Sequence, residues 1–319
     1  MGETHALGVV MPQNLIWLFA GVTLILLAGT VVGVWLRRTK PGAVTENLVA
    51  RVNAWWVMVA VLSLAFWAGP LGLILLFALL SLGALREFLV LTAQNPADRL
   101  VQILILSIAL PVQYWLIWDD WYGLYAIFIP VYAFLALLIV TAFQGDTTGF
   151  LARTSGLHLA LMLCVYALSH VPALLYLVIP GYDGQSALLI AFLIFVVQFS
   201  DVMQYVWGKL YGRHLIAPAL SPSKTWEGFA GGIATATLTG AALWWLTPFT
   251  PLQAGAMALA ATLMGFCGGL VMSAIKRDRG IKDWGALIAG HGGVLDRTDS
   301  LIFAAPVFFH LTRFFWGTT

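Results

Sequence analysis

Charged residues are scarce in this chain: only 9% of its 319 residues are Asp, Glu, Lys or Arg, whereas 61% are hydrophobic. An ordinary soluble domain has roughly 25% charged residues. So few charges cannot cover a surface exposed to water, which excludes an ordinary soluble protein. The composition is typical of helices in hydrocarbon, where each helix satisfies its own backbone polar groups.

Cysteines and basic N-terminal residues are also few. Cys164 and Cys267 each lie in an apolar run, and their spacing fits neither a disulfide framework nor a zinc site. No Lys or Arg precedes the first apolar run, at about residues 15–36, which ends at Arg37 and Arg38. A cleaved secretory signal needs a positively charged start and a shorter apolar core. We therefore expect this run to be a retained spanning helix.

Long apolar runs fill most of the chain. A bilayer core of roughly 30 Å needs about 20 apolar residues per helix. By this measure there are about ten candidate spans, at residues 14–36, 53–68, 71–91, 101–118, 122–143, 157–179, 187–208, 228–247, 253–275 and 299–316. The sequence predicts an all-α, polytopic membrane protein, a single integral membrane unit.

Basic residues gather near the cytoplasmic ends of membrane helices. With the N-terminus outside and the spans alternating, the inward side receives Arg37, Arg38, Lys40, Arg51, Arg86, Arg99, Arg153, Lys209, Arg213, Lys224, Lys276, Arg277, Arg279, Lys282 and Arg297. The outward turns carry Asp119, Asp120 and Asp183, and only Arg313 falls on that side. This distribution predicts that the two polar loops, at about 209–227 and 276–298, face the cytoplasm.

The second of these loops contains the strongest candidate site. Its carboxylates include Asp296 and Asp299, which share one face of a helix because they are three residues apart. Such a pair suits Mg²⁺, which takes one or two protein carboxylates together with water and substrate phosphates. His291 precedes Gly292 and Gly293, whose backbone can approach a phosphate closely because glycine lacks Cβ. The alternative is a solvated loop whose charges serve only topology.

A weaker segment lies upstream. Asp201 stands in an otherwise apolar helix, where an unpaired carboxylate is costly, so it is expected to be a metal ligand or a partner of Lys or Arg. Ser221-Pro222 leads to Lys224 and a helix start that Ser223 is expected to cap. A capped turn without function explains the same residues. Arg86-Glu87, near a helix end in the first half, is interpreted as a snorkelling pair and not as a site.

The stretch 273–299 resembles the signature of the phosphatidate cytidylyltransferases, also called CDP-diacylglycerol synthases. The residues that match in type and spacing are Ser273, Ile275, Lys276, Arg277, Lys282, Asp283, Gly285, Ile288, His291, Gly292, Gly293, Asp296, Arg297 and Asp299. The segment from Ser221 to Gly228 and the pair Asp201 and Tyr205 resemble further blocks of the family. The likeness covers roughly the last 130 residues, so we divide the chain into scaffold helices at 1–185 and a signature region at 186–319.

One departure from the family pattern stands out. Many bacterial members have Gly-Asp-x-x-Glu-Ser before the Lys-Arg pair, whereas this chain has Gly268-Gly269-Leu-Val-Met272-Ser273. Both carboxylates of the pattern are absent, with Asp201 and Asp283 as the available substitutes. The chain therefore resembles a divergent branch.

The resemblance implies an Mg²⁺-dependent transfer from CTP to phosphatidate or a related lipid phosphate in a bacterial inner membrane. A second cation and a homodimer are family-level expectations, and no nucleic-acid partner is expected. The implied metal ligands are Asp296, Asp299, Asp283 and Asp201. The implied catalytic residues are Lys224, Lys276, Arg277, Lys282, His291 and Arg297, and the implied substrate-binding residues are Ser221, Ser273, Gly292 and Gly293.

Two other functions agree with the same residues. A CTP-dependent lipid-alcohol kinase would release CDP, whereas a cytidylyltransferase releases pyrophosphate. A non-catalytic paralogue that binds or transports lipid would explain the missing carboxylate at Gly269, although such a protein has no evident use for the remaining acidic and basic residues.

Overall fold

The computed structural model describes residues 13–92, 95–285 and 292–318, and most of them are helical. Eight helical segments in these ranges are long and apolar enough to cross a membrane: Gln13–Thr39, Thr45–Trp67, Gly69–Leu91, Arg99–Trp118, Tyr122–Phe143, Phe150–Tyr176, Ser186–Tyr211 and Pro251–Asp278. Helices α11 (Trp226–Ala242) and α13 (Leu295–Trp316) stand at the two other expected places, but α11 is shorter and α13 more polar. The prediction of an all-α polytopic membrane protein is confirmed.

The chain forms two compact units, Met1–Leu76 and Phe77–Thr319. In the first unit, α1 (Gln13–Thr39) packs against α2 (Ala43–Trp67). The next helix, α3 (Gly69–Thr92), begins in the first unit and continues into the second. The expected boundary at residue 185 followed the position of the motifs, and as a functional division it stays a prediction.

Among the described residues of the second unit, three spans contain a π-helical turn. They are α4, η2 and α5 (Arg99–Leu104, Ile105–Ala109, Leu110–Trp118), α6, η3 and α7 (Tyr122–Ile127, Phe128–Ala133, Phe134–Phe143), and α8, η4 and α9 (Phe150–Leu161, Met162–Ala167, Leu168–Ala173). Pro130 lies inside η3, and Pro111 is the second residue of α5, two positions after the end of η2. Because proline has no N–H to donate, the helix locally adopts a wider turn at these positions. Short 3₁₀ turns are η1 (Pro96–Asp98), η5 (Leu174–Tyr176) and η6 (Trp244–Leu246).

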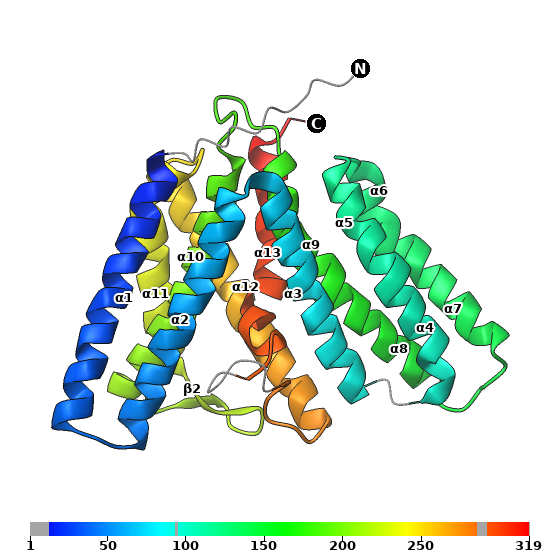
Figure 1. The fold of residues 1–319 in the computed structure, drawn as a ribbon, viewed down its shortest axis with the longest axis horizontal. Helices are drawn as coiled ribbons and strands as arrows, with labels where there is room; N and C mark the ends of the chain where they lie inside the picture. The colour runs from blue at the N-terminus through cyan, green and yellow to red at the C-terminus, as the bar shows by residue number, and fades with distance from the viewer. Residues whose placement is uncertain (1–12, 93–94, 286–291, 319) are drawn as a thin grey trace. The chain divides into compact units, whose positions relative to one another are not determined.

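Helices α10 (Ser186–Tyr211), α11, α12 (Pro251–Asp278) and α13 pack together in the second unit (Figure 1). Small residues allow their backbones to approach. A Cβ added to Gly232 of α11 would lie 2.6 Å from the backbone N of Gln204 on α10, and one added to Gly268 of α12 would lie 2.6 Å from the carbonyl oxygen of Asp299 on α13. Close contact at small residues is the usual way in which membrane helices associate.

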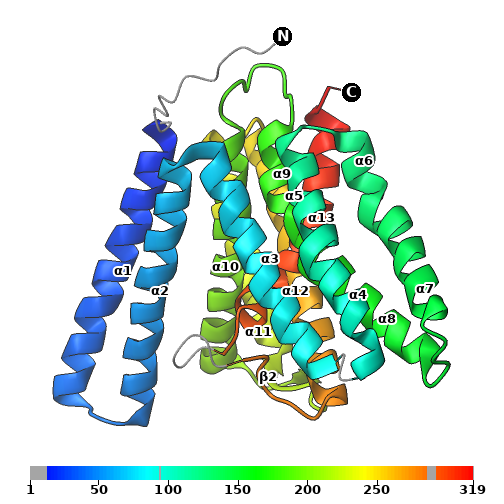
Figure 2. The ribbon, with the colours of Figure 1, turned by 45° about the vertical axis from the view of Figure 1, so that its right-hand side comes forward.

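A two-stranded antiparallel hairpin, β1 (Leu215–Ala217) and β2 (Ser221–Thr225), connects α10 to α11. It contains the only strands among the described residues. Figures 1 and 2 show the hairpin at the same end of the helices as the C-terminal end of α12 and the chain that follows it. The fold therefore brings the described parts of the two polar loops together at one end of the bundle.

Candidate active site

Lys224 lies near the end of β2, directly before the N-cap of α11, so the hairpin and the helix start fix its position. Thr225 is the N-cap of this helix, and its hydroxyl accepts a hydrogen bond from the backbone N–H of Gly228 at 3.1 Å. The expectation that Ser223 caps the helix is wrong, because the hairpin extends to Thr225 and Ser223 lies exposed within β2. The side chain of Lys224 turns inward from β2, with its ammonium 4.7 Å from the centre of the Phe266 ring.

Two carboxylates meet beside Lys224. Asp201 comes from α10 and Asp299 from the first turns of α13, and Ser300 connects them. The Ser300 hydroxyl donates to Asp201 Oδ2 at 2.7 Å, and the Ser300 backbone N–H donates to Asp299 Oδ1 at 2.8 Å. Arg297 also interacts electrostatically with Asp201. We name Asp201, Asp299, Ser300 and Lys224 the Asp201–Asp299 site.

Gly269 faces the same space. A Cβ added there would lie 2.8 Å from Lys224 Nζ and 3.9 Å from Asp299 Oδ2. The missing carboxylate of the bacterial pattern would therefore point into the Asp201–Asp299 site, in the space that the Lys224 ammonium now uses. Burial lowers the pKa of Lys224, while the charges of Asp201 and Asp299 oppose this shift.

Asp296, three residues before Asp299, has different partners. One oxygen accepts from Lys276 Nζ at 2.7 Å, and the other accepts from the backbone N–H groups of Trp284 and Gly293, both at 2.9 Å. Both oxygens are thus occupied by donors of the protein, and only 7% of the side chain is exposed. This arrangement holds Trp284 and Gly293, in the described parts of the loop, against the start of α13.

Glu87 of α3 is a residue of the site region that the sequence interpretation missed. Its two carboxylate oxygens accept hydrogen bonds from the backbone N–H groups of Val294 and Leu295, each at 2.9 Å. These N–H groups lie at the start of α13, where a helix offers them no backbone partner of its own. The interpretation of Arg86 and Glu87 as a snorkelling pair is wrong, since Glu87 turns to this helix start and Arg86 lies exposed. Adjacent residues do not face each other on a helix, so the sequence already indicated that Arg86 and Glu87 would have different partners.

The glycines of the signature leave room for the carboxylates of Glu87 and Asp296. A Cβ on Gly293 would lie 2.4 Å from both Glu87 oxygens, and one on Gly285 would lie 2.8 Å from Glu87 Oε1. Gly292 has a φ of +80°, and a Cβ there would lie 2.5 Å from Asp296 Oδ2. Phe88 next to Glu87 also stacks on Trp284, with ring centres 5.1 Å apart. In the described part of the loop, the absence of a Cβ at these glycines thus allows protein carboxylates to approach the backbone closely.

The remaining predicted site residues are spread around this centre. Arg277 is exposed and donates to the carbonyl oxygens of Leu220 and Ile281. Lys282 and Asp283 are exposed on the loop, and Ser221 begins β2. The Ser273 hydroxyl donates to the Gly269 carbonyl oxygen at 2.7 Å within α12. His291 lies outside the described residues.

The acidic side chains of the site provide carboxylate oxygens, which are the type of ligand that a hard divalent cation such as Mg²⁺ takes. Among the described residues, no group of three or more His, Cys, Asp or Glu side chains is placed to hold a metal ion. The two carboxylates of the Asp201–Asp299 site match what Mg²⁺ usually takes from a protein when water and substrate phosphates complete its coordination. Of the four carboxylates expected as ligands, the structure brings Asp201 and Asp299 together and leaves Asp283 exposed.

Comparison of the sequence with known proteins finds one family and several relatives. The cytidylyltransferase family matches residues 49–315. The uncharacterized protein YnbB of Escherichia coli (strain K12) is 38% identical over 306 residues, which are 95% of this chain and 99% of YnbB. The phosphatidate cytidylyltransferase of Mycobacterium leprae (strain TN) is 42% identical over 118 residues, 36% of this chain and 37% of that protein.

A similar partial match comes from Staphylococcus aureus (strain COL). Its phosphatidate cytidylyltransferase is 39% identical over 128 residues, which are 39% of this chain and 48% of that enzyme. The chain thus matches less than half the length of these two named enzymes, but nearly the whole of YnbB.

Proposed function

The chain belongs to the cytidylyltransferase family, and from this premise we propose that it joins the cytidylyl group of CTP to the phosphate of phosphatidate or a related lipid. The products are a CDP-lipid and pyrophosphate. The family and the partial relatives support a nucleotidyltransferase of the CDP-diacylglycerol synthase kind. The lipid acceptor and the need for Mg²⁺ are parts of the proposal.

The observation that carries the proposal is the Asp201–Asp299 site. Two carboxylates joined by Ser300 lie beside a half-buried lysine, at the end of the bundle where both polar loops meet. Such groups suit a reaction between two anionic phosphates, in which positioning and charge neutralisation supply most of the catalysis. A structural helix contact in a membrane has no need for this set of charges.

The reaction requires little proton chemistry. An oxygen of the lipid phosphate attacks the α-phosphorus of CTP, the new P–O bond forms, and the bond to the β-phosphate breaks as pyrophosphate leaves. The attacking phosphate is already an anion, so no general base is required. Asp201 and Asp299 would hold Mg²⁺, which when bound neutralises phosphate charge.

The basic residues have two roles in the proposed reaction, which are charge neutralisation in the site and attraction of the triphosphate. Lys224 and Arg297, beside the carboxylates, neutralise charge on the phosphates that enter the site. Exposed Arg277 and Lys282 attract the triphosphate from solution. The ion pair of Asp296 with Lys276 and the hydrogen bonds of Glu87 both hold the start of α13. They thereby position Asp299, which follows on the same helix.

The proposed location is a bacterial inner membrane, with this end of the bundle in the cytoplasm. The Lys and Arg residues near helix ends support this orientation, because cytoplasmic loops carry most basic residues. CTP would then reach the site from the cytoplasm, while the acyl chains of the acceptor stay in the bilayer.

The test compares Asp201→Asn and Asp299→Asn with Asp283→Asn in purified full-length protein, using CTP, phosphatidate and Mg²⁺. We expect the first two to lose activity roughly hundredfold or more, because they remove several kcal/mol of charge stabilisation. Asp283→Asn, the same change on the exposed loop, is expected to stay near wild type. Mg²⁺ should raise the melting temperature of the wild type but not of the two site variants.

The products separate the alternatives. Release of CDP in place of pyrophosphate would identify a lipid kinase, and absence of turnover with every lipid phosphate would favour a non-catalytic paralogue. Near-normal turnover by Asp299→Asn would overturn the metal assignment while leaving the reaction class intact.

A further inference from the structure

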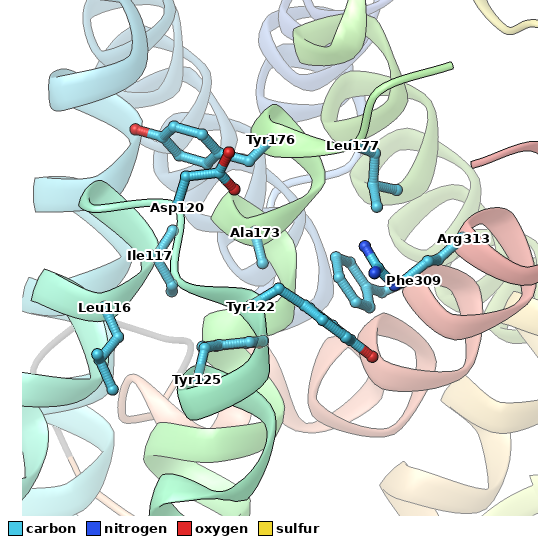
Figure 3. A pocket seen from close by; sticks show the side chains of 10 residues that line it. All are labelled: Leu116, Ile117, Asp120, Tyr122, Tyr125, Ala173, Tyr176, Leu177, Phe309 and Arg313. Atoms are coloured by element: carbon cyan, nitrogen blue, oxygen red, sulfur yellow. The ribbon is translucent and has the colours of Figure 1, made fainter. Parts of the chain in front are cut away.

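A second polar cluster lies at the opposite end of the bundle, around a cavity (Figure 3). Arg313 follows Asp299 on α13 by about 21 Å, at roughly 1.5 Å per residue. The cavity is lined by the ends of α5, α6 and α13, the turn at Asp120, and the segment that leads through η5 to Leu177. It is therefore separate from the Asp201–Asp299 site.

Arg313 is an unusual residue for this position. In the described part of the second unit, the turns at this end carry Asp119, Asp120 and Asp183, and Arg313 is the only Lys or Arg. Its guanidinium carbon lies 3.5 Å from the centre of the Tyr122 ring. Among the described residues its guanidinium has this ring contact but no ion pair and no side-chain hydrogen bond. A stacked guanidinium is preorganised and keeps its N–H donors available for an anion.

Asp120 provides the opposite charge, and its carboxylate interacts electrostatically with Arg313 although the two described side chains form no ion pair. Figure 3 shows Asp120 beside Tyr176 on one side of the cavity, and Arg313 beside Phe309 and Tyr122 on the other. The backbone of Asp120 has a φ of +53°, in the left-handed region that non-glycine residues seldom adopt. The cavity thus holds an acid and a base apart, with aromatic rings at both sides.

We propose that this cavity binds the headgroup of a zwitterionic phospholipid of the phosphoethanolamine class. The phosphodiester would accept hydrogen bonds from Arg313. The ammonium would lie against Asp120 and the face of Tyr176. Leu116 and Ile117 supply an apolar wall, and exposed tryptophans such as Trp118 and Trp121 flank the same turn, as aromatic residues do at membrane interfaces.

The headgroup charge separates this ligand from others. An anionic phosphatidylglycerol has the phosphodiester but no ammonium, so it satisfies Arg313 and leaves Asp120 without a partner. Free glycerophosphoethanolamine has both charges but no acyl chains. A lipid site is expected to prefer phosphatidylethanolamine to both.

The experiment measures lipid retention by native mass spectrometry of the full chain, released from nanodiscs of equal phosphatidylethanolamine and phosphatidylglycerol. We expect the wild type to retain phosphatidylethanolamine preferentially, by about tenfold, the scale of one charge-assisted contact. Asp120→Asn should reduce this preference to about one, and Arg313→Gln should weaken retention of both lipids. Asp119→Asn, the same change on the neighbouring exposed residue, should keep the wild-type preference.

Two further measurements complete the design. Asp120→Asn should keep the wild-type melting temperature and cytidylyl-transfer activity, so that a lost preference is not misfolding. Equal retention of the two lipids by the wild type, or equal behaviour of Asp119→Asn and Asp120→Asn, would overturn the proposal. Displacement of bound lipid by millimolar glycerophosphoethanolamine would also overturn it in favour of a site for the free compound.

Discussion

The carboxylate of Glu87 accepts the backbone N–H of Val294, and 207 residues separate the two in sequence. Leu295 donates to the other oxygen of the same carboxylate. A helix start near the membrane leaves unpaired N–H donors and a partial positive charge, and an acidic side chain satisfies both. Glu87 therefore connects α3 directly to the helix that carries Asp299.

Removal of this carboxylate should weaken both the fold and the reaction. Glu87→Ala leaves two backbone donors without partners, and we expect a loss of about 2–4 kcal/mol in the free energy of unfolding. Activity should fall as well, because Asp299 loses its fixed position. Thermal unfolding in detergent and pyrophosphate release measure the two effects. Arg86→Ala, at the exposed neighbouring residue, is the control and should change neither quantity; an equal loss in both variants would contradict the assignment.

Gly269 offers a test that separates activity from stability. In Gly269→Ala the new Cβ would lie 2.8 Å from the Lys224 ammonium, so that flexible side chain must move. We expect activity to fall roughly tenfold to a hundredfold, because small misplacements are costly in catalysis. Stability should stay level or rise by up to about 1 kcal/mol, because Ala favours a helix over Gly.

Gly265→Ala is the matched control for this change. It lies one helical turn earlier on α12, and its Cβ would meet Ser300 and Val197 at ordinary contact distances of 3.4 Å. Activity should remain near wild type in this variant. If Gly265→Ala lowers activity as much as Gly269→Ala, a general disturbance of the contact between α12 and α13 explains both.

Gly292 and Gly280 allow backbone conformation to be separated from crowding. Both have positive φ, but a Cβ at Gly292 would lie 2.5 Å from Asp296 Oδ2, whereas nothing lies within 4 Å at Gly280. Ala at a left-handed position costs about 1–2 kcal/mol, and crowding adds about 1–3 kcal/mol. Denaturant unfolding should therefore show a clearly larger loss for Gly292→Ala than for Gly280→Ala. Equal losses would show that Asp296 does not require the glycine.

Glu227 predicts a pH dependence of stability. Its carboxylate accepts the backbone N–H of Arg213 and a hydrogen bond from the His214 side chain, which lower the pKa of Glu227 to about 2. The ordinary value is 4.5. A lowered carboxylate pKa stabilises the folded state above pH 4.5, and this contribution is lost as the pH falls from 4.5 through 2.

The measurement compares thermal unfolding of the wild type and Glu227→Gln. The variant should be less stable at pH 7, and the difference should shrink steadily at pH 4 and pH 3. Asp278→Asn, at an exposed carboxylate near the same end of the bundle, is the control for the loss of one surface charge. A difference that grows on acidification has the wrong sign for a carboxylate of lowered pKa.

The signature residues were recognisable from sequence, but the different partners and roles of each residue were not. Asp296 and Asp299 form an obvious pair by spacing, yet Asp296 is occupied by Lys276 and two backbone donors while Asp299 meets Asp201. Spacing on a helix gives the face of a side chain but not what packs against that face. The partners come from α10, α12 and the loop before α13.

Ser223 and Glu87 show the same limit in local structure. Ser223 has the right type and place for a helix cap, but pairing of β2 with β1 moves the cap to Thr225. Glu87 looks like a charge at the end of a membrane helix, and only the folded chain reveals its partners. Its signal was indirect: glycines at 285 and 293 make room for it.

The sequence by itself determined that this is a polytopic helical membrane protein of the cytidylyltransferase family. Hydrocarbon permits few charges and requires long apolar runs, so both features are visible along the chain. The tertiary structure alone decided which carboxylates meet, which side chain uses the space beside Gly269, and how α3 holds the start of α13. These are contacts between side chains far apart in sequence, and they depend on helix packing, which apolar composition does not specify.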